Sequence, residues 1–173
     1  MIPTTPLGFR RGIRIGVDVG SVRVGVARTD PDGTLAVPVA TLTRPSARSA
    51  PRSDLLALVD LVAEYEPIEV VVGLPLALDG TERQAAAAAR AYAGDLAGVL
   101  RERGLGVPVR LLDERMTTAE ATRGLQAAGR DSRSGRLVVD QAAAVIIVQH
   151  ALDSERATGT PPGTLLTPSE DPE

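Results

Sequence analysis

The sequence has no cysteine, no lysine and no tryptophan, and it has a single histidine among its 173 residues. The lack of cysteine excludes disulfide bonds, thiolate nucleophiles and cysteine-ligated zinc. One histidine, His150, cannot build a histidine-rich metal site. Aromatic residues are scarce as well: Phe9, Tyr65 and Tyr92 are the whole set. If the chain binds nucleic acid, it is therefore expected to recognise backbone and shape rather than to stack on bases.

Long hydrophobic runs are also missing. No segment approaches the roughly 18 consecutive apolar residues of a membrane helix, and the stretch 1–12 has no apolar core of a signal peptide. We therefore expect a cytoplasmic protein that makes no membrane contact. The net charge of −3 and the pI near 5.3 argue against a protein that coats nucleic acid passively. They permit an enzyme that holds phosphates through metal ions and a local arginine cluster.

Hydrophobic periodicity predicts an α/β fold. Alternating apolar residues open the chain with three antiparallel strands, and apolar runs then alternate with helical patterns. The predicted strands cover 13–19, 22–27, 34–41, 68–72 and 107–112, and the predicted helices cover 53–66, 81–104, 117–129 and 136–152. Two of these helices begin with predicted capping boxes, at Thr81 with Gln84 and at Thr117 with Glu120. The order β-β-β-α-β-α-β-α-α predicts a mixed five-strand sheet with helices on its faces.

The chain shows no repeat and no internal linker, so a single domain is expected over residues 12–156. Apolar residues make up 43% of the sequence, which is enough for the core of one ordinary domain. The stretch 1–11 is expected to be a flexible N-terminus. The stretch 157–173, rich in proline, glycine and threonine, has little to bury and is expected to be a disordered C-terminal tail.

Three acidic residues stand in unusual places. Asp18 lies inside the apolar strand 13–19, where a lone carboxylate costs several kcal/mol unless it is paired, protonated or metal-bound. Glu114 follows shortly after the apolar strand 107–112, and ligands gather near such strand ends in sheets of this kind. Asp140 lies in the early turns of an apolar helix, with Arg136 as the one basic residue close to it in sequence.

Each acid also has an ordinary explanation. Asp18 could cap the turn that follows its strand, Glu114 could be a solvated loop residue, and Asp140 could be favoured by the dipole at a helix N-terminus. Taken together, three carboxylates suit a two-magnesium site, since Mg²⁺ prefers carboxylate and water oxygens. Two ions about 4 Å apart activate water and stabilise the leaving oxygen in phosphodiester hydrolysis.

Several short motifs occur in a fixed order over residues 12–153. They are Gly16-Val-Asp-Val-Gly20, Arg23-Val-Gly-Val-Ala27, Val72-Gly-Leu-Pro75, Asp79-Gly-Thr81, Asp113-Glu-Arg-Met-Thr-Thr118 and Asp140-Gln-Ala-Ala-Ala144. In this order they resemble the YqgF family, also called the RuvX family, of Holliday-junction-resolvase-like nucleases. The sequence departs from many members at Arg136, where they have lysine.

The resemblance implies a ribonuclease-H-like fold and a hydrolase that cuts phosphodiester bonds. It places the acidic triad of the family on Asp18, Glu114 and Asp140, which would be both the catalytic residues and the ligands of Mg²⁺ or Mn²⁺. It further implies a nuclease in 5′-end processing of pre-16S ribosomal RNA, hence in ribosome biogenesis. Holliday-junction cleavage in DNA recombination and repair is the alternative.

The expected partner is a nucleic acid, either pre-ribosomal RNA or branched DNA. Arg130, Arg133 and Arg136 stand three residues apart just before Asp140, where they could grip phosphates, and Arg23 could add to this contact. A solvated charged loop would have the same pattern. We expect the protein itself to be a monomer or a weak homodimer.

Two rival functions share parts of this pattern. Sugar kinases and actin-like ATPases also begin with a Gly-x-Asp-x-Gly loop, but they need two such domains and a second Asp-x-Gly loop, which this sequence lacks. A non-catalytic RNA-binding assembly factor could keep the fold, although a pure binder gains nothing from three converging acids.

Overall fold

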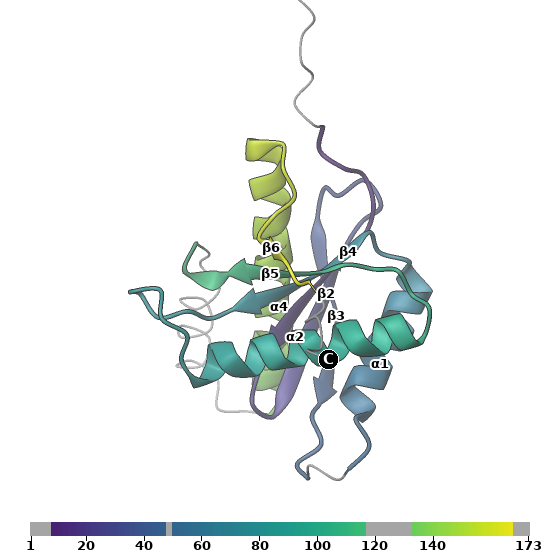
Figure 1. Cartoon of the computed structure of the whole chain (residues 1–173), viewed down its shortest axis with the longest axis vertical. Helices are drawn as coiled ribbons and strands as arrows, with labels where there is room; N and C mark the ends of the chain where they lie inside the picture. The colour runs from purple at the N-terminus through teal and green to yellow at the C-terminus, as the bar shows by residue number, and fades with distance from the viewer. Residues whose placement is uncertain (1–7, 48–49, 117–132, 168–173) are drawn as a thin grey trace, which may run out of the picture.

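The computed structural model describes residues 8–47, 50–116 and 133–167. Its elements, in chain order, are β1 (Arg14–Val19), β2 (Arg23–Thr29), β3 (Ala36–Thr43), α1 (Ser53–Tyr65), β4 (Glu69–Leu74), α2 (Gln84–Glu102), β5 (Val109–Asp113), the 3-10 turn η1 (Glu114–Met116), α4 (Arg133–Thr158) and β6 (Thr164–Leu165) (Figure 1). The six strands form one mixed sheet in the order β3-β2-β1-β4-β5-β6. Strands β1, β4 and β5 are parallel, whereas β2, β3 and β6 run antiparallel to their neighbours.

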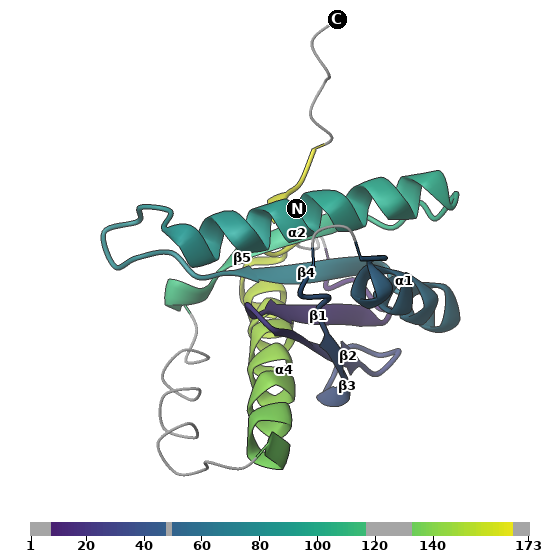
Figure 2. The same ribbon diagram turned by 90° about the horizontal axis from the view of Figure 1, so that it is seen from below.

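Helices α1 and α2 cover one face of the sheet, and α4 crosses the other (Figure 2). Side chains alternate between the two faces of a strand, so Ile15 and Val17 of β1 point toward α1 and α2. Helix α1 meets them with a stripe at helical spacing, as the sequence predicts; its buried apolar residues are Leu55, Leu58, Val59 and Val62. Burial of each such side chain contributes about 2 kcal/mol, which makes this face the main core.

The face under α4 is built from small residues. A Cβ atom at Gly16 would lie 2.6 Å from the Cβ of Val148, and one at Gly25 would overlap the carbonyl oxygen of Asp140. The helix backbone therefore rests directly on β1 and β2. Next to this contact, Gln141 Nε2 donates to Thr41 Oγ1 over 3.0 Å and ties α4 to β3.

A buried ionic network joins the amino ends of the parallel strands to the last turns of α4. Arg14 and Glu69 are fully buried, and Glu155 is 1% exposed. Glu155 accepts hydrogen bonds from Arg14 Nη2 at 2.8 Å and from Arg10 Nε at 2.7 Å, and Glu69 accepts one from Arg110 Nε at 2.8 Å. Because both carboxylates have arginine partners, this charge can stay buried.

The predicted flexible N-terminus, 1–11, includes residues that pack on the domain. Arg10 belongs to the buried network, and the Phe9 ring packs under the guanidinium groups of Arg14 and Arg156, at 4.8 and 4.4 Å from the ring centroid. One arginine and one aromatic ring are enough to hold this segment on the domain. Amino-acid composition cannot indicate so few contacts. Residues 8–11 are therefore part of the domain.

The expected C-terminal tail, 157–173, also begins too early, and the sheet has six strands rather than five. After α4 the chain turns at Gly163, which has φ of +64°, and Thr164–Leu165 pairs with β5. Leu166 donates its N–H to the Val109 carbonyl over 2.9 Å and packs on the main core. A strand of two residues is too short to produce a periodic pattern in the sequence.

Local details differ as well. The predicted capping box at Thr81 and Gln84 is wrong, because the Thr81 hydroxyl donates instead to Asp79 Oδ1 at 2.7 Å and α2 begins only after Arg83. The helix predicted over 117–129 lies outside the described residues. The last helix is longer than the predicted 136–152. Among the described helices, none is long and apolar enough to cross a membrane.

The buried network generates a prediction for Glu155→Gln. Burial raises the pKa of Glu155, but hydrogen bonds from Arg10 and Arg14 outweigh it, so the pKa lies below its ordinary value. Removing the charge leaves two arginines undercompensated and should lower the free energy of unfolding by about 3 kcal/mol at pH 7, measured by urea denaturation. Because the folded pKa is lowered, the charge of Glu155 stabilises the protein at pH values above the unfolded pKa of about 4.3. This stabilisation is lost as the pH falls through the folded pKa.

The gap between wild type and Glu155→Gln should therefore close as the pH falls below about 4. Glu82→Gln is the matched control, because Glu82 pairs with Arg90 on the surface and its loss should change stability little. Equal stability of Glu155→Gln and wild type at pH 7 would contradict the role of the network.

Candidate active site

Asp18 is buried near the carboxyl end of β1, with 6% of its surface exposed. It shares the α4 face with Gly16, since the two are separated by one residue along the strand. Its partner across the antiparallel pair is Gly25 of β2. On the other side, Val17 pairs with Val72 in β4, so the next residue, Gly73, lies beside Asp18. Asp18 thus stands between two glycines on a face with little side-chain bulk.

Glu114 begins η1 directly after β5 and is 2% exposed. Its carboxylate lies over Gly73, where a Cβ atom would overlap Oε1 of Glu114 and lie 2.6 Å from Cδ1 of Ile147. Glycine at this position gives the carboxylate the room to reach back over β4 toward Asp18. The solvated-loop explanation of Glu114 is therefore wrong, because the side chain points into the protein.

Arg115 joins η1 to the end of β5 and to the loop after β4. Arg115 donates from Nε and Nη2 to the Asp113 carboxylate, at 3.0 and 2.6 Å to Oδ2, and from Nη1 to the Leu78 carbonyl at 3.4 Å. The guanidinium hydrogen bonds hold the pKa of Asp113 below its ordinary value. These contacts flank Glu114 on both sides in sequence and fix its backbone. The role of Arg115 was not predicted, although the motif Asp79-Gly-Thr81 marked the loop that it contacts.

Asp140 reaches the same edge from α4. Its backbone rests on Gly25, and its Oδ2 accepts a hydrogen bond from Nε of Arg23 at 2.8 Å. The side chains of Arg23 and Asp140 are 25% and 20% exposed. The local sequence pointed to Arg136 alone as a basic neighbour. Arg23 was missed as a partner because it lies 117 residues away, but its position two residues before Gly25 puts it on the face that carries Asp18.

The structure therefore brings the three acids to one end of the α4 face. Among the described residues, however, no group of three or more acidic or histidine side chains is arranged to hold a metal ion. The pairing of Asp140 with Arg23 is consistent with this, because one oxygen of that carboxylate already accepts a hydrogen bond from the guanidinium. The donor set itself suits Mg²⁺ or Mn²⁺ chemically, because it consists of carboxylates, one of which occupies the space over Gly73.

The other predicted site residues are placed less fully. Arg133 and Arg136 belong to the first turns of α4, which lead to Asp140. Arg130 lies outside the described residues. Contact of these arginines with phosphate stays a prediction.

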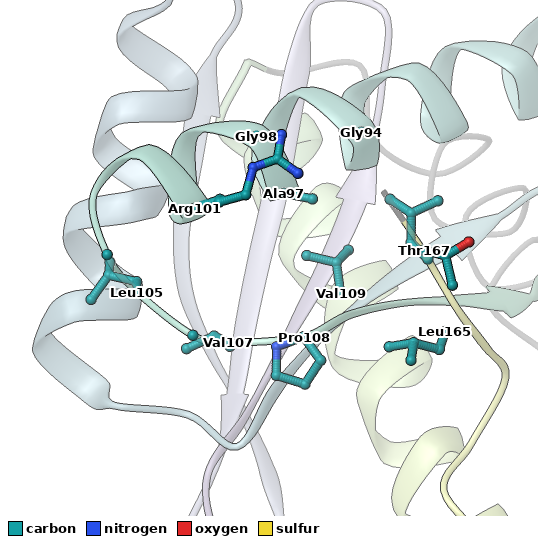
Figure 3. A pocket seen from close by; sticks show the side chains of 13 residues that line it. Gly94, Ala97, Gly98, Arg101, Leu105, Val107, Pro108, Val109, Leu165 and Thr167 are labelled. Atoms are coloured by element: carbon teal, nitrogen blue, oxygen red, sulfur yellow. The ribbon is translucent and has the colours of Figure 1, made fainter. Parts of the chain in front are cut away.

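A pocket of about 910 Å³ lies away from the acids, between the C-terminal half of α2, the loop 104–108 and the segment around Leu165 (Figure 3). Its lining is mostly glycine, alanine and aliphatic residues, with Arg101 as the one charged side chain. It contains none of the groups needed for hydrolysis, and the acids lie elsewhere.

The contact between Gly25 and Asp140 generates a prediction for Gly25→Ala. The new methyl group would meet backbone atoms, which no side-chain rotation can relieve, so α4 must shift. The free energy of unfolding should fall by about 1–3 kcal/mol in urea denaturation. Gly98→Ala on α2 is the control: nothing lies within 4 Å of its Cβ, so it should raise stability by about 0.5–1 kcal/mol. An unchanged stability of Gly25→Ala would show that α4 is not seated as described.

Comparison with known proteins places the chain in a family. Residues 12–154 match the family described as RuvX, Holliday junction resolvase. A Streptomyces avermitilis protein is 55% identical over 157 residues, covering 91% of this chain and 96% of the relative. A Nocardioides protein is 50% identical over 163 residues, covering 91% and 98%. Both relatives are described as a "putative pre-16S rRNA nuclease".

Among solved structures, Thermus thermophilus RuvC in complex with a Holliday junction substrate is similar in fold. Its TM-score is 0.53 at 15% identity, with 90% of this chain and 99% of that chain covered. RuvC without the junction gives a TM-score of 0.51 at 14% identity. At such identities the likeness concerns the fold alone, and it confirms the ribonuclease-H-like architecture.

Proposed function

The chain belongs to the RuvX family, and we propose that it is a metal-dependent nuclease that hydrolyses phosphodiester bonds in 5′-end processing of pre-16S ribosomal RNA in the cytoplasm. The observation that supports this proposal most directly is that Asp18, Glu114 and Asp140 lie at one end of the α4 face, around Gly25 and Gly73. Acids that gather from three separate elements, two of them almost fully buried, are costly for folding, which favours a use in catalysis.

Each acid has a distinct part in this proposal. Asp18 would contribute a carboxylate fixed by β1, and Glu114 one fixed by η1 and the contacts of Arg115. Asp140 would complete the set from α4. Bound Mg²⁺ or Mn²⁺ would supply an activated water and stabilise the leaving oxygen. The chain contributes orientation and shielding from bulk water, since Asp18 and Glu114 are almost fully buried.

Substrate choice follows from the relatives. The Streptomyces avermitilis and Nocardioides proteins are described by their action on pre-16S rRNA, and their sequences align over nearly the full length of the domain. RuvC, whose structure includes a Holliday junction, shares the fold at 15% identity. We therefore take ribosomal precursor RNA as the substrate and branched DNA as the alternative that the same assay decides.

A cleavage panel tests the activity. The substrates are a pre-16S 5′ precursor, a single-stranded RNA and a four-way DNA junction, each with Mg²⁺, with Mn²⁺ or with EDTA. Cleavage should require the metal and favour the precursor. Asp18→Asn, Glu114→Gln and Asp140→Asn should each lower kcat at least about 100-fold, since each removes a charged group proposed to hold the metal ions on which hydrolysis depends.

Asp60→Asn on the exposed face of α1 is the matched control and should cleave like wild type. Circular dichroism should show that all four variants fold. Full cleavage in EDTA, or near wild-type cleavage by Asp18→Asn or Asp140→Asn, would refute the proposed site. Preference for the junction would support the DNA alternative.

Binding of a polyanion by an acidic protein requires a local basic surface. We propose that Arg130, Arg133 and Arg136 supply it, because they precede Asp140 in sequence. Changing Arg130 and Arg133 together to Ala should weaken RNA binding and reduce the slope of log Kd against log salt by about one unit for each phosphate that is no longer bound. The measurement is fluorescence anisotropy between about 50 and 200 mM salt.

The control is the double change of Arg101 and Arg103 to Ala at the end of α2, which removes the same charge from exposed positions on the opposite face of the sheet. It should leave the salt slope unchanged. If both double variants behave alike, the arginines before Asp140 have no special contact with phosphate.

A further inference from the structure

Arg23 is paired with one of the predicted catalytic acids. Its Nε lies 2.8 Å from Oδ2 of Asp140, and both side chains are about three-quarters shielded from solvent. A charge-assisted hydrogen bond in such surroundings is stronger than one on an open surface. In this structure the cationic partner of Asp140 is thus part of the chain itself.

The backbone around this pair cannot easily adjust. Gly25, two residues after Arg23, is in contact with the Asp140 backbone, and Gln141 is hydrogen-bonded to Thr41. Asp140 can therefore change its partner only by turning its own carboxylate or by losing the guanidinium. The guanidinium is the more mobile of the two groups, since it stands at the end of a long side chain, which is 25% exposed.

We propose that Arg23 is the internal counter-ion of Asp140 and that a divalent metal must displace it to bind. The guanidinium and the metal compete for the same carboxylate, and the guanidinium released by metal binding faces the edge to which the substrate phosphate comes. This exchange keeps Asp140 neutralised at every stage and rests on the proposed metal site. It makes Arg23 a positioning residue for Asp140 rather than one of the metal-binding groups.

Two other roles for Arg23 lead to different results. If the pair only ties β2 to α4, its loss should loosen the site and weaken metal binding. If Arg23 grips phosphate at all times, its loss should weaken RNA binding and leave metal affinity unchanged. Competition alone predicts that removing Arg23 strengthens metal binding while destabilising the metal-free protein.

Isothermal titration with Mn²⁺ on chelator-treated protein tests the exchange. Arg23→Ala should bind Mn²⁺ about 3- to 10-fold more tightly than wild type, the ratio expected for removing a competing, partly exposed ion pair. Arg28→Ala is the matched control, because Arg28 lies on the same strand, carries the same charge and stacks on Tyr65 instead of pairing with Asp140. Its Mn²⁺ affinity should equal that of wild type.

Thermal unfolding supplies a readout that does not depend on activity. Without metal, Arg23→Ala should melt below wild type, since Asp140 loses its partner, and the two should converge at saturating Mn²⁺. A double-mutant cycle of Arg23→Ala and Asp140→Asn in EDTA should show coupling between the two side chains.

The outcomes separate the two proposals. If wild type binds Mn²⁺, Asp140→Asn abolishes that binding and Arg23→Ala binds no more tightly than wild type, the exchange is overturned and the metal site stands. If wild type binds no Mn²⁺, the proposed metal site fails and the exchange fails with it. Coupling in EDTA without metal binding would show a purely structural pair.

Discussion

Helix α4 lies on the sheet at backbone contact distance, and the arrangement of the acids depends on this close approach. Gly25 permits it, because any side chain there would overlap Asp140. Gly73 permits a second approach, that of the Glu114 carboxylate. The shape of the face that carries the candidate site thus depends on glycines, which have no side chain. A sheet with larger residues at these positions would hold α4 at an ordinary packing distance and Asp140 away from Asp18.

The same face carries charge at both of its ends. At the amino ends of the parallel strands, Glu155 and Glu69 are enclosed by arginines and almost fully buried. At the carboxyl ends, Asp140 is bound by Arg23, and its side chain is 20% exposed. Burial makes the first cluster a fixed part of the fold, because separating its members would leave a charge buried without a partner and without water. Partial exposure leaves the second pair open to exchange with an incoming ion.

The sequence predicted features that repeat along the chain, and it failed for single contacts between distant residues. Periodicity located five strands and the buried face of α1, and the apolar setting of Asp18 correctly indicated burial. The pair of Arg23 and Asp140 was invisible, because its partners are 117 residues apart and no local pattern joins them. Likewise, one arginine docks the N-terminal segment and two residues form β6, too few to stand out from composition.

The seating of α4 restricts how its sequence can vary in length. Asp140 and Glu155 are about four helical turns apart, so both project toward the sheet. Inserting or deleting one residue between them would rotate one end of the helix by about 100° relative to the other. Either the ionic network or the candidate site would then lose its acid. Homologous chains can therefore exchange side chains along this segment, but they should keep its number of residues.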